Sequence, residues 1–507
     1  MKIMVIGGGG REHAIIRKLK ENPAAETIYA LPGNGGIARD AVCVPIGAKD
    51  IPAITAFAKE QGIDYAVVTP DDPLALGCVD ALEAEGIPCF GPRQRAAMIE
   101  SSKVFAKDLM ARYGIPTAAC RVFDDPAAAL SYVETAPLPA VVKADGLALG
   151  KGVIIAFTRQ EARDAVRAMM TEKKFGDSGS RVVIEEFLEG PEVSVLAFTD
   201  GETVVPMVSS MDHKRAGDGD TGLNTGGMGT VAPNPYYTSE VAKTCMERIF
   251  LPTIRAMKAE GREFRGCLYF GLMITREGPK VIEYNCRFGD PETQVVLPLM
   301  ESDLLETMRA VTEGRLKDTE VRFREGAACC LVLASKGYPE AYEKGAEIRI
   351  PEKTWPHVFV AGAAEKDGKL VTSGGRVLGV TAVADSLPEA VKEAYALGDT
   401  IDFETKYFRR DIGRRALKAI SSSVRRIYVE KKPGLDQEAE ALRREAVEFL
   451  GLKGLKKVRL LNRYDTEGLS EALFVAAAGT VFSEPPVDDT YAEPRSEERR
   501  VGKECRL

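Results

Sequence analysis

Charged and amide side chains gather at the end of an apolar run, Val281–Asn285. Side chains alternate between the two faces of a strand, so Glu283 and Asn285 project from the same face. A carboxylate and an amide oxygen are hard donors that suit Mg²⁺. Arg287 and Asp290-Pro291-Glu292 follow at once, and this mixture of charges is hard to explain as structure alone. The segment therefore predicts a magnesium site with charged groups beside it.

A second segment has lysines at both ends of a glycine-containing loop. Lys143 closes one apolar run and Lys151 opens the next. A flexible loop with cationic edges can fold over a triphosphate and exclude water. The segment is not a Walker loop, because three residues separate Gly146 from Gly150 and Gly152 replaces the Ser or Thr. A surface hairpin with solvated lysines is the alternative interpretation, and the segment alone leaves it open.

The run Val182–Leu188, followed by Glu192, is a candidate adenine pocket. An apolar strand end can offer backbone N–H and C=O groups to the edge of a base. A nearby carboxylate can accept hydrogen bonds from ribose hydroxyls. Acidic residues on a strand edge without any ligand are the alternative.

Four glycines, Gly7–Gly10, stand between a predicted strand and a predicted helix. Bare backbone N–H groups at a helix N-terminus favour an anion such as phosphate. A dinucleotide site would need a third glycine, but counting from Gly7 or Gly8 reaches Glu12 or His13. It would also need an acid after the second strand, which ends in Pro32–Gly36 instead. Phosphate binding without a dinucleotide fits better, and a plain tight turn remains the alternative.

The elements that must position these groups alternate between strand and helix. Residues 1–100 predict a parallel doubly wound sheet, because each apolar run is bounded by Gly or Pro. Later segments predict a helix over 101–113, a second group of strands, a long glycine-rich loop over 216–229, an antiparallel hairpin and a small α+β region over 327–420. The predicted class is α/β, with an N-terminal doubly wound sheet, central α+β domains and a small C-terminal α+β domain.

The composition limits the function classes. A chain of 507 residues predicts several domains, and a net charge of -7 gives no footprint for nucleic acid or an anionic membrane. No apolar run approaches the ~20 residues of a membrane helix, and the N-terminal strand leaves no room for a signal peptide. Ten cysteines without a CxxC pair and only three histidines argue for reduced thiols and against an imidazole metal site. A cytoplasmic protein is expected.

The order of these motifs over residues 1–423 resembles that of the ATP-grasp superfamily and, within it, the glycinamide ribonucleotide synthetase family. The segments that carry the resemblance are Gly9–Ala14, Pro32–Asn34, Lys143–Val153, Glu185–Leu188, Asp212–Arg215, Asn224–Gly229 and Asn285–Val295. The run Arg287–Val295 is similar to the family's diagnostic signature. Two departures are Thr69–Leu74, where many members have Gly-Pro-Glu before a Pro-Leu pair, and Tyr284, which replaces a usual Phe.

The resemblance implies a ligase of purine biosynthesis that joins glycine to 5-phosphoribosylamine. Glycine would attack the γ-phosphate of ATP to give glycyl phosphate and ADP, and the amine would then displace phosphate. The implied cofactors are ATP as co-substrate and Mg²⁺ or Mn²⁺. The implied partners are these small molecules, without nucleic acid or membrane. A monomer is expected, with possible transient contacts to other purine-pathway enzymes.

The resemblance also implies roles for individual residues. ATP would be held by Lys103, Lys143, the lid residues Gly150, Lys151 and Gly152, the adenine hinge Glu185, Glu186, Phe187 and Leu188, and Glu192 at the ribose. The metal ligands would be Glu283 and Asn285. The catalytic groups would be Arg287, Asp212, Lys214 and Arg215, with Arg287 on the transferring phosphoryl group. The substrate side would be formed by Gly9, Gly10, Arg11, Pro32, Gly33, Asn34, Asp290, Pro291 and Glu292.

The expected domains are a substrate domain over 1–101, an ATP-grasp domain over 102–326 with a lid at about 120–195, and a C-terminal synthetase domain over 327–423. The tail changes character. Residues 424–494 resemble the small N-terminal domain of phosphoribosylformylglycinamidine synthase, cut short and without that enzyme's catalytic residues. Residues 495–507 resemble a translated sequencing adapter, and a charged solvated tail is the alternative.

Two rival functions differ in chemistry. Another ATP-grasp ligase, such as a carboxylase that uses carboxyphosphate, would respond to bicarbonate and not to glycine. A regulatory ATP-binding module would be expected to lack Glu283, Asn285 or Arg287, and all three are present.

Overall fold

The computed structural model describes residues 1–147, 152–423, 425–466, 469 and 471–492. Gly150 and Lys151 of the expected lid and the adapter-like residues 495–507 therefore lie outside the described residues. The chain divides into two compact units, residues 1–416 and residues 417–507, and each is described by itself.

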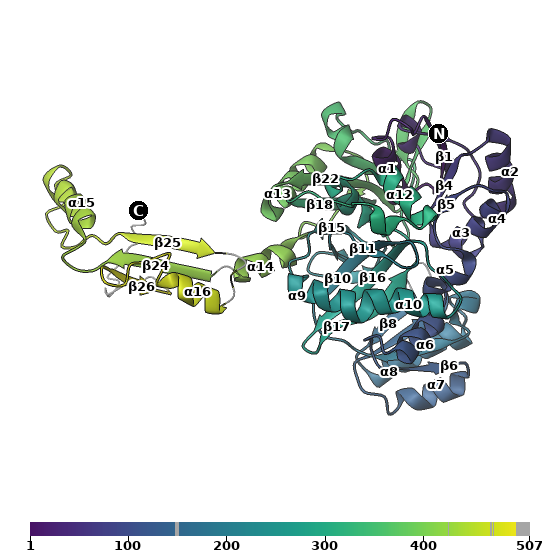
Figure 1. The fold of residues 1–507 in the computed structure, drawn as a ribbon, viewed down its shortest axis with the longest axis horizontal. Coiled ribbons are helices and arrows are strands. Elements are labelled where there is room, and N and C mark those ends of the chain that lie inside the picture. The colour runs from purple at the N-terminus through teal and green to yellow at the C-terminus, as the bar shows by residue number, and fades with distance from the viewer. Residues whose placement is uncertain (148–151, 424, 467–468, 470, 493–507) are drawn as a thin grey trace. The chain divides into compact units, whose positions relative to one another are not determined.

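The N-terminal region of the first unit is a five-stranded parallel sheet (Figure 1). Its strand order, β3-β2-β1-β4-β5, confirms the doubly wound arrangement. The strands are β1 (Lys2–Gly7), β2 (Thr27–Pro32), β3 (Val42–Cys43), β4 (Tyr65–Val68) and β5 (Cys89–Phe90). The helices are α1 (Gly10–Leu19), α2 (Ile51–Gln61), α3 (Asp71–Ala75), α4 (Cys78–Ala84) and α5 (Gln94–Ser101).

Helix α1 begins at the glycine cluster. Gly9 is its N-cap, and the carboxylate of Glu12 accepts a hydrogen bond from the Gly9 N–H at 2.6 Å. The loop after β1 touches the loop after β2, since a Cβ on Gly8 would lie 2.3 Å from the carbonyl oxygen of Gly33. Only glycine permits this approach.

Two antiparallel sheets form the middle of the first unit. One has the order β6-β9-β7-β8, with β6 (Cys120–Phe123), β7 (Ala140–Ala144), β8 (Val153–Ala156) and β9 (Val182–Glu186). The other has the order β11-β10-β16-β17, with β10 (Glu192–Thr199), β11 (Val204–Pro206), β16 (Gly266–Thr275) and β17 (Gly278–Asn285).

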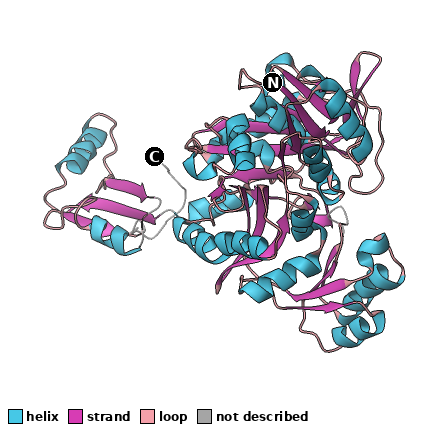
Figure 2. Cartoon of the chain, turned by 45° about the vertical axis from the view of Figure 1, so that its right-hand side comes forward, coloured by secondary structure: helices cyan, strands magenta, loops and turns pink. Residues whose placement is uncertain are grey.

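Helices accompany both sheets, as Figure 2 shows. The helices of residues 103–313 are α6 (Lys103–Tyr113), α7 (Pro126–Val133), α8 (Arg159–Val166), α9 (Ser239–Cys245), α10 (Leu251–Ala259), α11 (Thr293–Leu299) and α12 (Leu304–Glu313), of which α11 packs chiefly against α1. The helix expected over 101–113 starts later, because Ser102 caps α6 by accepting a hydrogen bond from the Phe105 N–H.

A third sheet joins the C-terminal region of this unit to two short earlier strands. Its order is β12-β15-β18-β22-β19, with β23 also paired to β18. The strands are β12 (Met211–Asp212), β15 (Gly229–Ala232), β18 (Ala327–Ser335), β19 (Val358–Val360), β22 (Arg376–Ala384) and β23 (Lys406–Tyr407). Helix α13 (Leu387–Thr400) packs on β18 and β22, and β20 (Ala363–Lys366) and β21 (Lys369–Thr372) form a separate hairpin.

The prediction of a long loop over 216–229 is wrong in part. Strands β13 (Arg215–Gly217) and β14 (Thr221–Asn224) form an antiparallel hairpin there, with Asp218–Asp220 as its turn. Both strands are short, glycine-containing and half-buried or exposed. Their sequence therefore lacks the apolar alternation that marks a strand.

The described part of the second unit is a three-stranded antiparallel sheet of order β25-β24-β26. Its strands are β24 (Arg425–Lys431), β25 (Leu461–Thr466) and β26 (Asp488–Tyr491), accompanied by α15 (Gln437–Glu448) and α16 (Glu471–Ala478). Helix α14 (Arg414–Ser423) spans the boundary between the units. In the part of the chain that the structure describes, no helix is long and apolar enough to cross a bilayer.

Candidate active site

A cavity of about 680 Å³ in the first unit is lined by residues of the N-terminal, middle and C-terminal regions. Apolar lining comes from β7, β8 and the segment after β9. Charged lining comes from the end of β17, the segment after β12 and the C-terminal region. The cavity therefore offers an apolar compartment next to a strongly charged one.

Glu185 lies in the apolar compartment with only 4% of its surface exposed. Its Oε2 pairs with Lys143 Nζ at 3.0 Å and with Lys107 Nζ at 3.2 Å. Its Oε1 is buried without a hydrogen-bond partner. A buried carboxylate oxygen is expected to have a donor, so this atom is suited to a donor group of a ligand.

Two lysines bring positive charge to the cavity between β7 and α6. Lys143 Nζ donates to the Ile282 carbonyl at 3.1 Å, and Lys103 Nζ donates to the Gly146 carbonyl at 3.1 Å. Burial lowers the pKa of Lys103, while the Glu283 carboxylate opposes this effect. Gly152 also lines the cavity at the start of β8. Lysines in these positions are suited to bind the negatively charged oxygens of a phosphate group.

Lys214 and Glu283 form the centre of the charged compartment. Lys214 Nζ lies 3.4 Å from Glu283 Oε1 and 3.7 Å from Glu192 Oε2. Lys214 lowers the pKa of Glu283 to about 2, so this carboxylate is ionised at neutral pH. Glu283 in turn raises the pKa of Lys214. Glu283 and Asn285 both line the cavity, together with their neighbours Ile282 and Tyr284.

Glu100 organises the residues that follow β17. Its Oε1 lies 2.9 Å from Arg287 Nη2, and its Oε2 accepts a hydrogen bond from the Cys286 N–H at 2.7 Å. The Asn285 amide nitrogen can donate to Glu100 Oε1 at 3.0 Å, which turns the amide oxygen away from that carboxylate. Burial opposes a charged Arg287, but Glu100 and Asp71 raise the pKa of Arg287. Its Nε is buried without a partner, which suits an anionic ligand.

The half-buried Asp212 and the buried Glu292 are two interacting carboxyl groups beside Lys214. Burial and the Glu292 charge raise the pKa of Asp212 well above its usual value. Burial also raises the pKa of Glu292. Two neighbouring carboxyl groups resist double ionisation, so the pair can hold and exchange a proton.

The residues expected on the substrate side divide into two groups. Arg11, Asp290 and Glu292 line the cavity. The described lining does not include Gly9, Gly10, Pro32, Gly33, Asn34 or Pro291. Asn34 instead holds its own loop, since its amide donates to the Gly8 and Val360 carbonyls and accepts from the Gly36 and Ile37 N–H groups.

The C-terminal region supplies cavity residues that the sequence did not indicate. Arg376 Nη1 donates to the carbonyl oxygens of Gly226 and Asp290, each at 2.8 Å, and the Tyr338 hydroxyl accepts from the Gly226 N–H. Burial of Asp290 favours its neutral form, but Arg376 and Arg11 lower its pKa. Arg415 also lines the cavity. Lys107 could have been noticed, because it follows Lys103 at helical i,i+4 spacing. Glu100, Arg376, Tyr338 and Arg415 carry no local signal.

The chain was compared with known families and structures. Residues 1–100 match the N domain of phosphoribosylglycinamide synthetase, residues 101–293 its ATP-grasp (A) domain and residues 328–415 its C domain. A phosphoribosylamine–glycine ligase of Vibrio vulnificus is 50% identical over 423 residues, which are 82% of this chain and 99% of that protein. The ligase of Caldanaerobacter subterraneus is 48% identical over 413 residues, 81% of this chain and 99% of that protein.

Solved structures show the same fold. The crystal structure of a phosphoribosylamine–glycine ligase from Thermotoga maritima has a TM-score of 0.73 and 36% identity, and the match covers 81% of this chain and all of that chain. The biotin carboxylase domain of a Hydrogenobacter thermophilus carboxylase has a TM-score of 0.62 at 17% identity, covering 80% of this chain and 91% of that chain. The second match concerns the fold alone. The predicted α/β fold class is confirmed.

Proposed function

The chain belongs to the phosphoribosylamine–glycine ligase family, and from this membership we propose how its cavity performs the family's reaction. The enzyme is an ATP-dependent ligase that forms glycinamide ribonucleotide from 5-phosphoribosylamine and glycine in purine biosynthesis. The observation that carries the proposal is one cavity with an apolar compartment around Glu185 and a charged one around Glu283, Lys214 and Arg287.

We propose that adenine occupies the apolar compartment. Glu185 Oε1 would accept from the 6-amino group, and the segment Glu186, Phe187 and Leu188 would offer its backbone to the base edge. Glu192 would accept from the ribose hydroxyls. Lys103 and Lys143 would hold the phosphates under the loop that ends at Gly152. The burial of Glu185 Oε1 without a partner and the two cavity lysines support this assignment.

The first chemical step forms glycyl phosphate. A glycine carboxylate oxygen attacks the γ-phosphorus, a new O–P bond forms, and the bond to the ADP oxygen breaks. Arg287 would stabilise the transferring phosphoryl group, because its guanidinium is held by Glu100 and keeps one buried N–H available.

The second step forms the amide. The phosphoribosylamine nitrogen attacks the acyl carbon, the carbon–oxygen bond to phosphate breaks, and phosphate leaves. The nitrogen loses a proton, which the Asp212–Glu292 pair would accept. Lys214 and Arg215 would organise this side. The turn of Gly9, Gly10 and Pro32–Asn34 would receive the 5-phosphate at the start of α1, with Arg11, Asp290 and Pro291 beside it.

We propose Glu283 and Asn285 as ligands of Mg²⁺ or Mn²⁺. An ionised carboxylate and an amide oxygen fit an ion that takes its remaining ligands from phosphates and water. The bound ion would supply neutralisation of the phosphate charge during transfer.

The test traces the carboxylate oxygen atoms of glycine by isotope labelling. With glycine labelled with ¹⁸O in its carboxylate, one label is expected in the released phosphate, because the acyl carbon–oxygen bond breaks. ADP release should require glycine and not respond to bicarbonate, and Glu283→Ala should abolish it. Unlabelled phosphate would overturn the glycyl phosphate proposal. Bicarbonate-dependent ADP release would favour the carboxylase alternative.

We also propose the domain boundaries 1–101, 102–326, 327–423, 424–494 and 495–507, and a cytoplasmic monomer. The similarity of residues 424–489 to the N-terminal domain of phosphoribosylformylglycinamidine synthase stays a proposal, as does an adapter origin for residues 495–507. Reading the source DNA across codons 424–507 tests both, since an uninterrupted frame free of adapter sequence would contradict the second.

A further inference from the structure

The β13–β14 hairpin carries cavity residues. Lys214 immediately precedes β13, Arg215 is its first residue, and both line the cavity together with Asn224 at the end of β14. The Arg215 side chain donates to the Gly222 carbonyl across the hairpin at 2.8 Å. The position of the hairpin backbone therefore decides where these side chains lie in the cavity.

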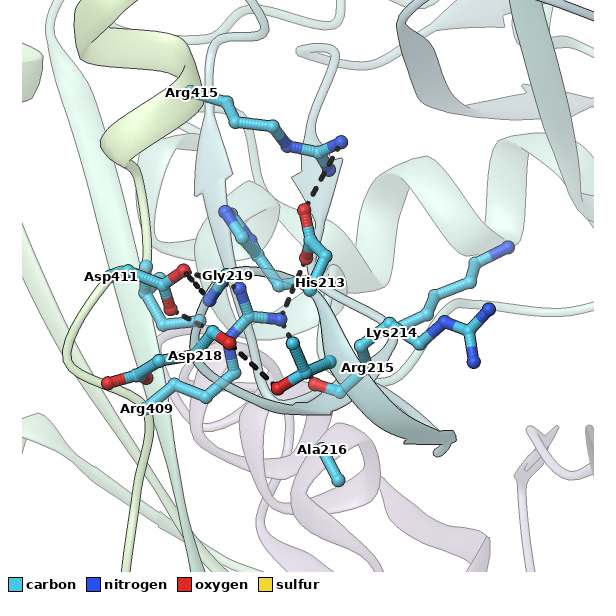
Figure 3. Close-up of polar contacts among 12 residues, drawn as sticks. His213, Lys214, Arg215, Ala216, Asp218, Gly219, Arg409, Asp411 and Arg415 are labelled. Carbon is cyan, nitrogen blue, oxygen red and sulfur yellow. Dashed lines mark hydrogen bonds and ion pairs between the residues drawn. The ribbon is translucent and has the colours of Figure 1, made fainter.

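Arg409, which follows β23, holds this backbone from the C-terminal region. It is 1% exposed. Its Nε and Nη2 form two parallel bonds to the Asp411 carboxylate, at 2.8 and 2.9 Å. Its Nη1 donates to the Arg215 carbonyl and to Asp220 Oδ1, each at 3.0 Å (Figure 3). One guanidinium thus joins the first strand of the hairpin, its turn and the C-terminal region.

Residues next to Arg409 also form hydrogen bonds with the hairpin. The Gly219 N–H donates to Asp411 Oδ2 at 2.8 Å, and the Arg410 N–H donates to Asp218 Oδ1 at 2.9 Å. The Tyr407 hydroxyl donates to the Ala216 carbonyl at 2.8 Å. The segment 407–411 therefore contacts the hairpin along its first strand and around its turn, as Figure 3 shows for several of these residues.

The turn needs such support. Asp220 has φ +56°, a left-handed conformation that residues other than glycine rarely adopt. Its carboxylate also lies 3.6 Å from Arg415, another cavity residue. A strained turn persists when surrounding contacts fix it. Arg409 is the central contact, because it bonds to Asp220 and to the Asp411 carboxylate that holds Gly219.

We propose that Arg409 is a positioning residue of the ligase reaction. It fixes the backbone of the β13–β14 hairpin and thereby directs Lys214 and Arg215 into the charged compartment, on the phosphoribosylamine side of the cavity. The inference rests on the function proposed above for that compartment. Arg409 is not among the described residues that line the cavity, so its effect passes through the hairpin.

The geometry requires arginine and not merely a positive charge. Four bonds leave the guanidinium in three directions, two of them as a planar fork to Asp411. A lysine ammonium has three donors at one point and cannot reproduce the fork. Arg409→Lys keeps the positive charge that pairs with Asp411 and Asp220, yet it removes the fixed geometry. This variant therefore separates positioning from folding.

The experiment compares Arg409→Lys with Arg410→Lys. Arg410 is the adjacent residue, its side chain is 57% exposed, and it pairs with Asp399 away from the hairpin. Kinetic constants would be measured for ATP, glycine and phosphoribosylamine formed in situ from ribose 5-phosphate and ammonia. Hydrogen exchange of peptides covering residues 213–225 would report the hairpin directly. Asp220→Asn is a second variant, which removes the charge at the turn and leaves Arg409–Asp411 intact.

For Arg409→Lys we expect a rise of about tenfold or more in the apparent KM for phosphoribosylamine, as for loss of a charged hydrogen bond. The KM for ATP should stay within about twofold, and the hairpin amides should exchange faster. Arg410→Lys should match the wild type. Unchanged KM and exchange in Arg409→Lys, or a fall in kcat alone that follows the folded fraction, would overturn the proposal.

A folding defect in the variant and a lack of activity in the wild-type enzyme have different meanings. If Arg409→Lys does not fold, Asp220→Asn decides, and normal KM and exchange in that variant would refute the positioning role. If the wild-type enzyme forms no glycinamide ribonucleotide, the proposed function fails, whereas a failure confined to the variants concerns Arg409 alone.

Discussion

At the scale of single residues, the buried Glu185 carboxylate would distinguish adenine from guanine if the base binds where we propose. Its Oε2 pairs with Lys143 and Lys107, and its Oε1 has no hydrogen-bond donor from the protein. The 6-amino group of adenine can donate to this atom. The 6-oxo group of guanine would place an acceptor against it, which is unfavourable in a buried site.

We therefore predict that Glu185→Gln reduces the preference for ATP over GTP. Hydrogen bonds to charged groups contribute about 1.5–3 kcal/mol, so kcat/KM for ATP should fall about 10- to 100-fold. The value for GTP should fall less or rise, because the new amide can donate to the 6-oxo group. The control is Glu189→Gln, the same change at an exposed position four residues on. An equal loss for both nucleotides would contradict the prediction.

Glu283 and Asn285 could be predicted from the sequence as candidate site residues, because they stand two residues apart at the end of an apolar run. Glu283 and Asn285 line the cavity at the end of β17, where the pairing with β16 is regular again after a register shift just before Glu283. Glu100 and Arg376 could not be predicted, because each reaches the site from a distant element: Glu100 pairs with Arg287, and Arg376 with the Asp290 and Gly226 carbonyls. Nothing in their own neighbourhoods marks them.

At the scale of elements, a buried histidine joins helix α1 to strand β19. His13 Nδ1 accepts a hydrogen bond from the Val360 N–H at 2.8 Å, and Nε2 lies 3.0 Å from Asp40 Oδ2. Since Nδ1 acts as an acceptor, the ring is neutral and carries its proton on Nε2. Burial lowers the pKa of His13 to about 4, despite the opposing contact with Asp40.

The burial of His13 predicts that the folded protein loses stability as the pH falls from 6.5 toward 4. The unfolded imidazole binds a proton near pH 6.5 and the folded one near pH 4, so stability is complete above 6.5 and falls as the pH drops toward 4. One such group contributes a slope of about 1.4 kcal/mol per pH unit in this window. His213, whose pKa burial also lowers to about 4, should add a similar slope.

The measurement is the thermal unfolding midpoint between pH 7 and pH 5. His13→Gln can retain both hydrogen bonds without titrating, so its midpoint should fall less steeply than that of the wild type. His357→Gln is the control, because it leaves both buried imidazoles in place. A wild-type midpoint that does not change across this window would contradict the prediction, as would equal slopes in all three proteins.

Elements that depend on contacts with distant residues could not be predicted from local sequence patterns. Strands β1 and β4 are buried apolar runs, and the sequence predicted the parallel sheet to which they belong. The β13–β14 hairpin was missed because contacts with Arg409, Asp411 and Tyr407, about 190 residues later, stabilise it. Local propensity cannot report such long-range support.

At the scale of the whole molecule, the described lining of the cavity ends at Arg415, and the family match ends at the same residue. The second unit has few buried apolar side chains in its described part, namely Ile427, Val429, Ala439 and Ala477. It exposes large ones, including Phe449 at 82%, Leu450 at 73% and Val481 at 73%. Large apolar side chains exposed to this extent are available for contacts with other molecules.

We therefore predict that removal of residues 424–507 preserves the ligase and improves its behaviour in solution. The kcat/KM for each substrate should stay within about twofold, because no residue of the described cavity is lost. Light scattering at equal concentration should show less association than for the full chain, because the exposed apolar side chains are gone. Removal of residues 493–507 alone is the matched control, and it should leave the association unchanged. A tenfold loss of turnover in the folded 1–423 protein would mean that the second unit takes part in catalysis.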